Sequence, residues 1–359
     1  MVARTLARHL LCFVLPVTTL AFVATGPHER GVGWWLLPIA LSIAADLASP
    51  AARRQPPQVL PLRPFDAILR ALVALQLVNV VLAARLVAIT GFFDWQTLVA
   101  VALVGTTSGY SGIVVAHELI HRREPRLRLL GRGLMGLVLY EHFATEHLRG
   151  HHVRVGTPED PATARFGESF HAFFRRTVPA QLRSAWRLEA ARLGDVEMPW
   201  WDRRLLRSRV VHGLVAEWAF ALALAGVFGW GAFCFHLLQA AWAVRLLECV
   251  NYFEHWGLVR SGPRALGMDS WDANSWFTLH TLVGLSRHAD HHAFAARPYP
   301  QLRFVAESPK LPAGYFGMVP LAMVHNRRFQ RLMTAELRRR GLGPYRRTGQ
   351  SATPPDHPS

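Results

Sequence analysis

The chain has 359 residues, of which 51% are hydrophobic and only 18% are charged. The charged fraction is below the roughly 25% of soluble domains, and the apolar content excludes a disordered chain. The formal net charge is +16, and these few charges lie between long apolar runs, as in membrane proteins. No aromatic–basic binding module accompanies the positive charge, so we do not expect nucleic-acid binding.

Six apolar stretches have about the length that a helix needs to cross the hydrocarbon core, roughly 20 residues. In chain order they are 9–25, 33–49, 67–91, 97–117, 210–228 and 230–254. Arginines precede the first stretch, lie between the second and third, and follow the fourth. By the positive-inside rule, this predicts a multi-pass protein of the plasma (inner) membrane with both termini in the cytoplasm.

An alternative applies to the first stretch. Residues 1–26 also resemble a signal peptide, with a basic start, an apolar centre and small residues near Ala24. Cleavage would leave five spans and break the charge rule for the rest of the chain. We therefore expect about six transmembrane helices in an all-α fold.

A long cytoplasmic insert, 122–209, is predicted between the fourth and fifth spans. Within it, residues 129–145 are apolar and predict a short helix that dips into the membrane. Residues 173–193 mix Phe, Leu and Trp with Arg, a pattern typical of an amphipathic interfacial helix. The Pro- and Ser-rich segment 341–359 is predicted to be a disordered tail, which leaves 1–340 as a single membrane domain.

Nine of the eighteen histidines form four compact groups at or just beyond the cytoplasmic ends of the predicted spans. They are His117 and His121; His147, His151 and His152; His255; and His288, His291 and His292. Spacings of three and four residues place side chains on one face of a helix. We therefore expect the rings of each group to point the same way.

Each group alone has another explanation. The segment His117–His121 has the HExxH pattern, which by itself also fits a zinc protease helix with Glu118 as the base. A metal transporter would place its ionisable groups nearer the bilayer midplane, so a transporter or sensor is disfavoured. Taken together, nine clustered imidazoles without metal would leave unpaired polar groups if neutral and would repel one another if charged.

Nine ligands exceed the three or four that protein supplies to one zinc ion, so two metal ions with four or five nitrogens each are predicted. Imidazole suits zinc, copper, iron and nickel. Four neighbouring carboxylates are expected to accept ring N–H groups and orient the ligands, although a bridging glutamate stays open: Glu118, Glu146, Glu254 and Asp290. His142 and His280 are expected to have supporting or structural roles. The other histidines follow no ligand pattern: His9, His28, His171, His212, His236, His325 and His357.

These groups resemble the motifs of the alkane 1-monooxygenases (AlkB-type), integral-membrane non-haem di-iron hydroxylases of the fatty acid desaturase-like superfamily. The matching segments are His117–His121, Glu146–His152, Asn251-Tyr-Phe-Glu-His-Trp-Gly257, Leu285–His292, Thr157-Pro-Glu-Asp-Pro161 and Leu311–Met318. The Asn251–Gly257 element separates this family from ordinary desaturases. Four residues differ from those that are usual in the family: Arg122, Leu148, Ala289 and Trp256. None of them replaces a motif histidine, but they leave the identity of the substrate open.

The resemblance implies two irons held by the nine motif histidines, and hydroxylation of the terminal methyl group of an alkane to a primary alcohol with O2. Methyl hydroxylation of alkyl-aromatics, as in xylene monooxygenases, is the alternative, and a fatty acyl desaturase or hydroxylase is less favoured. Trp34, Trp35 and Leu77 are candidate lining residues for a substrate bore, although packing or lipid contact is the simpler explanation for each.

Electrons must come from another protein. The three cysteines, Cys12, Cys234 and Cys249, lack CxxC spacing, which excludes a built-in iron–sulfur or rubredoxin module. The resemblance implies rubredoxin or a ferredoxin, fed by a reductase. The arginine-rich segment Arg122–Arg132 is a candidate docking face for such an acidic carrier, while the positive-inside rule explains it equally well.

Overall fold

A computed structural model of the chain describes residues 2–57, 60–260 and 262–346. Within these ranges the fold is helical, as predicted, and the only β features are isolated bridges between Ala51 and Ser275 and between Asp272 and Lys310. Five helical stretches are long and apolar enough to cross a membrane: Val2–Thr25, Leu62–Thr90, Trp95–Ile120, Arg209–Phe228 and Trp230–His255. The second predicted span, 33–49, is a shorter apolar helical segment, Val32–Leu47.

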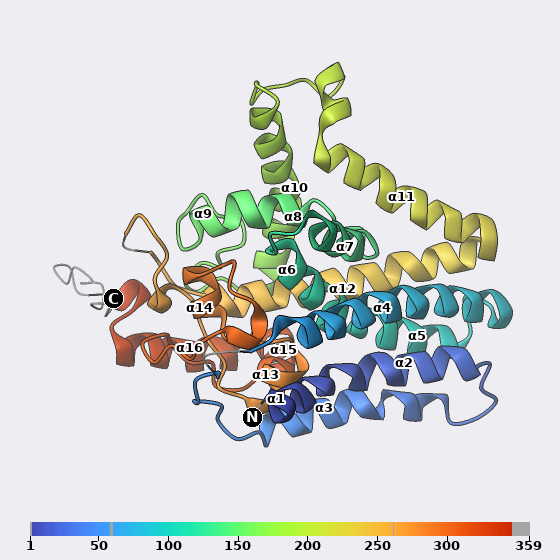
Figure 1. The fold of residues 1–359 in the computed structure, drawn as a ribbon, viewed down its shortest axis with the longest axis horizontal. Coiled ribbons are helices and arrows are strands. Elements are labelled where there is room, and N and C mark those ends of the chain that lie inside the picture. Colours follow the sequence, from blue (N-terminus) through green and yellow to red (C-terminus); the bar gives the residue numbers. More distant parts are fainter. Residues whose placement is uncertain (1, 58–59, 261, 347–359) are drawn as a thin grey trace.

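The spans pack as a bundle around one buried stretch (Figure 1). Helices α4 (Leu62–Thr90) and α5 (Trp95–Thr107) contact each other, and each contacts both α2 (Val14–Thr25) and α12 (Trp230–His255). The α5 helix continues through a π-helical segment, Ser108–Ile113, into α6 (Val114–Ile120). This continuous stretch is the most enclosed span, with 83% of its most apolar window buried.

Two glycines let α5 and α12 approach closely. A Cβ atom at Gly105 would lie 2.7 Å from Trp242 Cδ1, and one at Gly109, four residues later, would lie 2.8 Å from Leu246 Cδ1. Small residues four apart bring helix backbones together in membranes. The close packing holds α6 and the end of α12, which carry the predicted ligands His117 and His255, next to each other.

The N-terminal and C-terminal parts of the chain are joined through α3 (Leu37–Leu47). Buried Asp46 accepts hydrogen bonds from Ser275 Oγ at 2.5 Å, Thr278 Oγ1 at 2.6 Å and the backbone N–H of Gly317 at 2.9 Å. These partners belong to the start of α13 (Trp276–Thr281) and to α15 (Tyr315–Met323). Helix α1 (Val2–His9) lies at this same end of the bundle, where it contacts α13, and α16 (Asn326–Arg340) lies at that end as well (Figure 1).

The predicted insert is a helical layer at that end. The segment predicted as 129–145 is α7 (Pro125–Gly136) and a turn that leads to α8 (Phe143–Glu146). The predicted amphipathic helix is α10 (Phe170–Arg192), which runs across the direction of the bundle before α11 (Arg209–Phe228) returns (Figure 1).

The chain is described as far as Arg346, and a 3₁₀ turn, Gly343–Tyr345, follows α16. Leu342 is buried and Tyr345 packs against the core. The remainder of the predicted tail lies outside the described residues.

Candidate metal centre

The nine motif histidines come from four separate elements that meet at one end of the bundle. His117 lies on α6 and His121 follows it, while His255 is the last residue of α12. The second box begins with a π-helix, His147–His151, which continues into α9 (His152–Arg154). The fourth box is α14 (His288–Ala293). Every one of the nine side chains is buried or half-buried.

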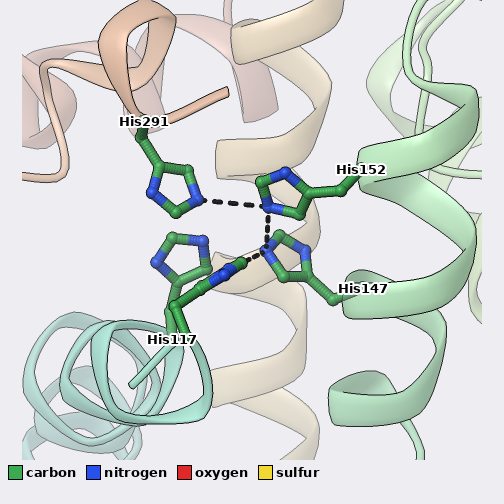
Figure 2. Close-up of side chains that lie close together, drawn as sticks. His117, His147, His152 and His291 are labelled. Carbon is green, nitrogen blue, oxygen red and sulfur yellow. Dashed lines mark hydrogen bonds between the residues drawn. The ribbon is translucent and has the colours of Figure 1, made fainter. Parts of the chain in front are cut away.

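The rings form two adjacent groups, in each of which one nitrogen per ring lies within 4.8 Å of all the others. The five-histidine group contains His117, His121, His147, His152 and His291. The four-histidine group contains His151, His255, His288 and His292. Figure 2 shows His117, His147, His152 and His291 converging from three sides of one point.

Nitrogen–nitrogen contacts run through both groups. In the larger one, the Nε2 atom of His147 lies 3.0 Å from Nε2 of His121 and 3.0 Å from Nε2 of His152. In the smaller one, Nε2 of His288 lies 3.1 Å from Nε2 of His255 and 2.9 Å from Nε2 of His292.

Hydrogen bonding between the rings does not satisfy these nitrogens. An imidazole nitrogen either donates one proton or accepts with one lone pair, yet Nε2 of His147 and Nε2 of His288 each meet two other Nε2 atoms. Nε2 of His117 and Nε2 of His151 are buried without any hydrogen-bond partner. Two nitrogens bound at right angles, each about 2.1 Å from one ion, would lie about 3.0 Å apart. The donor sets therefore fit a metal ion in each group.

The second box divides its ligands between the two groups, which corrects the expected pairing. The sequence spacing pairs His147 with His151, four residues apart, whereas the structure places His147 with His152 and places His151 in the other group. In a π-helix the hydrogen bonds reach the fifth residue, so residues five apart share a face. Helix α14 divides its ligands as well, because His288 and His292 join one group and His291 joins the other.

One carboxylate that sequence reasoning did not single out orients a ligand. Asp160 Oδ2 accepts a hydrogen bond from Nδ1 of His151 at 2.9 Å, which turns Nε2 of that ring toward its group. The hydroxyl of Thr163 and the backbone N–H of Ala162 also donate to Asp160. The only sequence signal was the family likeness of Thr157–Pro161, which did not specify a role for this aspartate.

Of the four carboxylates predicted to support ligands, only Glu254 lies against one. Its Oε1 atom is 3.3 Å from Nδ1 of His288, and it also accepts a hydrogen bond from the hydroxyl of Tyr315. The other three predicted carboxylates have different partners within the described chain. Glu118 pairs with Arg122, Glu146 with Arg154, and Asp290 with Arg297.

Burial keeps most of the rings outside the spans uncharged. Burial, and then repulsion from neighbouring rings, lowers the pKa of His147 and of His291 well below the usual value. Burial is the largest single effect and opposes protonation of His151, but the charge and hydrogen bond of Asp160, together with the charges of Glu146 and Glu248, outweigh it and raise the pKa of that ring. Metal ligation uses the lone pair of a deprotonated imidazole nitrogen, so the neutral rings suit this role.

The remaining described histidines lie outside both groups. His142 packs edge-on against Tyr140, and burial lowers its pKa to about 4. His280 hydrogen-bonds through Nδ1 to the carbonyl of Trp276 and packs against His9. Neither ring belongs to a histidine group. His357 lies outside the described residues.

A small cavity of about 30 Å³ adjoins both groups. His117, His147 and His288 form one side of it. The rest is mainly apolar and comes from the α5–α6 stretch, α12 and neighbouring segments, including Tyr110, Ile113, Val114, Leu246, Leu247 and Val250. The residues suggested for a bore lie elsewhere: Trp34 and Leu77 are exposed on the bundle surface, and Trp35 packs against Phe22.

Comparison with known proteins agrees with this architecture. The fatty acid desaturase family model matches residues 93–322. Alkane 1-monooxygenases 1 and 2 of Pseudomonas aeruginosa are 39% and 38% identical, over 78% and 80% of this chain and 74% and 78% of their own lengths. A xylene/toluene monooxygenase hydroxylase component of Pseudomonas putida is 25% identical over 59% of this chain and 58% of its own length.

The fold and the buried histidine groups thus define a helical membrane protein built to hold metal ions. The chain belongs to the fatty acid desaturase family and, within it, to the alkane 1-monooxygenases. It is accordingly an oxygen-dependent hydroxylase.

Proposed function

We propose that each histidine group binds one iron and that the protein hydroxylates the terminal methyl group of an alkane to a primary alcohol. The observation that carries the proposal is the convergence of nine imidazoles, without thiolates, beside an apolar cavity. An unactivated C–H bond does not yield to side-chain acids or bases, and bound iron supplies the O2-dependent oxidation that they lack.

The protein's own residues would bind and position the substrate. An alkane partitions into the bilayer, so access from the lipid phase between spans suits it. Leu246, Leu247 and Val250 on α12 and Ile113 on the facing stretch would exclude water and hold the chain end toward the histidines. A cavity of only about 30 Å³ requires these side chains to move apart when a substrate binds.

Ligand removal tests this proposal. His151→Ala and His288→Ala should each lose iron and hydroxylation together while still inserting in the membrane, because each removes a donor from the four-histidine group. Iron per chain and alcohol formed from octane are the measurements. His325→Ala is the matched control, since this histidine is exposed and outside both groups. Normal iron with full activity in His151→Ala would contradict the assignment.

Substrate class needs its own experiment. The similarity to alkane 1-monooxygenases favours alkanes, whereas the more distant xylene/toluene relative supports alkyl-aromatics as the second candidate. Supplying octane, hexadecane and p-xylene together to cells that contain a matched redox partner separates the two. The zinc protease alternative is disfavoured, because Glu118 is buried in a 2.8 Å ion pair with Arg122 instead of being free to act as a base.

We also propose rubredoxin or a ferredoxin, with its reductase, as the electron source, and the inner membrane with cytoplasmic termini as the location. The grouping of α1, α16 and the histidine groups at one end of the bundle supports a single cytoplasmic face (Figure 1). The candidate docking segment is smaller than expected. Arg122 is buried and paired with Asp66, and Arg132 is paired with Glu141. Arg128 is exposed but donates to the backbone carbonyls of Arg122 and Arg123, which leaves Arg123 and Arg126 as the exposed arginines whose side chains have no partner in the described chain.

A further inference from the structure

A second hollow, of about 560 Å³, lies between α7 and α11 and is separate from the metal groups. The residues of α11 that line it are at positions 209, 212, 213, 216, 217 and 220. Their spacing of three and four residues places them on one face of the helix, over three turns or about 16 Å. From α7 it is lined by Leu129, Gly133 and Gly136. The lining is mainly apolar, and Gly133 and Gly136 on α7 leave the groove open, whereas the space beside Gly213 on α11 is taken by the Glu141 side chain.

One end of this groove is basic. Arg132, Arg209 and His212 line it, and Arg132 Nη2 donates to the carbonyl of Arg209 at 3.4 Å, which places both arginines at the N-terminus of α11. The positive end of the helix dipole adds to their charge.

The surrounding charges are not balanced. Arg149 and Arg192 are within electrostatic range of Arg209. Two carboxylates pair with these arginines: Glu141 with Arg132, and Glu189 with Arg149 and Arg192. Glu217 also lines the groove, so four guanidinium groups face three carboxylates and leave one positive charge in excess. Arg209 is the arginine of this set whose guanidinium group has no carboxylate partner in the described chain. Glu217, deeper in the groove, is paired differently and accepts the backbone N–H of Glu141 at 3.0 Å.

Helix α11 also faces lipid. It is the least enclosed of the five spans, with 28% of its most apolar window buried, and Val215, Leu222 and Val227 are exposed on its surface. A groove along such a helix is accessible to lipid chains, and basic pockets between membrane helices bind anionic head groups.

We propose that this groove binds an anionic phospholipid, with one acyl chain along the α11 stripe and the phosphate at Arg132 and Arg209. The bound lipid bridges α7, which begins four residues after His121, and α11, which leads directly into α12. The proposal does not depend on which metal or substrate the enzyme uses.

Lipid retention tests the proposal directly. The full-length protein is equilibrated with mixed vesicles of phosphatidylglycerol and phosphatidylcholine, extracted in mild detergent, and analysed for bound lipid by native mass spectrometry. The wild type should retain one phosphatidylglycerol in preference to phosphatidylcholine. Arg209→Gln should weaken that retention about fivefold, the effect expected of one arginine near a head group.

A steric variant provides an independent arm. A Cβ at Gly133 meets nothing within 4 Å, so Gly133→Leu fills the groove without a clash at Cβ and should abolish retention. Gly226→Leu is the control, because Gly226 is equally unobstructed, lies on α11 and does not line the groove. Equal retention of the two lipids by the wild type, or unchanged retention in Gly133→Leu, would overturn the proposal. So would a raised KM for octane in Gly133→Leu with lipid retention intact, since the groove would then be a substrate path.

Discussion

At the scale of single residues, His151 shows how a neighbouring carboxylate sets the direction of a ring. Its Nδ1 atom donates to Asp160, which is itself fixed by Thr163 and the backbone N–H of Ala162. Because Nδ1 carries the proton that is donated to Asp160, Nε2 carries the lone pair that can bind a metal ion. This Nε2 atom is buried without another partner. Mutation of a residue that orients a metal ligand in this way typically lowers metal affinity by 10- to 100-fold.

We therefore expect Asp160→Ala to weaken metal binding in the four-histidine group by about 10- to 100-fold, with a corresponding loss of hydroxylation at limiting iron. Asp160→Asn should lose less, because its amide oxygen can still accept the His151 N–H. Iron titration of the purified variants measures the effect. Glu159→Gln changes the adjacent, fully exposed carboxylate and should bind iron as the wild type does. Equal affinity in Asp160→Ala and the wild type would show that His151 is oriented by other contacts.

At the scale of elements, the π-helix His147–His151 decides which ligands act together. An α-helix would align His147 with His151, whereas the wider π turn aligns His147 with His152 and releases His151 to the second group. A second π-helical segment, Ser108–Ile113, lies on the stretch that leads to His117 and contributes to the cavity. Both departures from α-helical geometry thus adjoin the histidine groups, as π-bulges often adjoin functional sites.

Double variants test this assignment. His147→Ala combined with His152→Ala removes two donors from the five-histidine group, so the variant should keep about one iron per chain, in the intact group. His147→Ala combined with His151→Ala damages both groups and should lose both irons. Metal analysis and Mössbauer spectra of the two proteins make the comparison. If the two double variants instead retained the same amount of iron, the separation of His147 from His151 would be wrong.

At the scale of the whole molecule, the chain brings its N-terminal helices and the last described helices together. Asp46 ties α3 to α13 and α15, and this contact joins the N-terminal helices to the segment that carries the last histidine box. The exposed arginines Arg123 and Arg126 follow α6 and are close in sequence to the ligand His121. An acidic carrier that docks there would meet cations near the metal groups.

Replacing Arg123 and Arg126 together with Gln should raise the KM for the electron carrier by about three- to tenfold, the effect of losing exposed charge pairs. Iron content should not change, because neither side chain contacts a ligand histidine. The effect should shrink as ionic strength rises, since salt screens exposed charges. Steady-state kinetics against carrier concentration provide the measurement, and Arg203→Gln, an exposed arginine before α11, is the control. Carrier dependence identical to that of the wild type would place the docking site elsewhere.

The sequence by itself determined the class of molecule and the set of imidazoles. Apolar length and basic flanks predicted a helical membrane protein, because crossing a bilayer constrains composition over about 20 residues at a time. The clustered spacing of nine histidines, from His117 to His292, predicted two metal ions, because so many imidazoles gathered in short boxes exceed the needs of one site.

Only the tertiary structure decided how those rings are shared and supported. Asp160 meets His151 because the chain turns back after α9, whereas Glu118, adjacent to His117 in sequence, points to Arg122. The π-helical turn that separates His147 from His151 could not be predicted from the spacing of the histidines in the sequence. Spacing along one helix reports which side chains share a face. Which face meets which partner depends on packing between elements distant in the sequence.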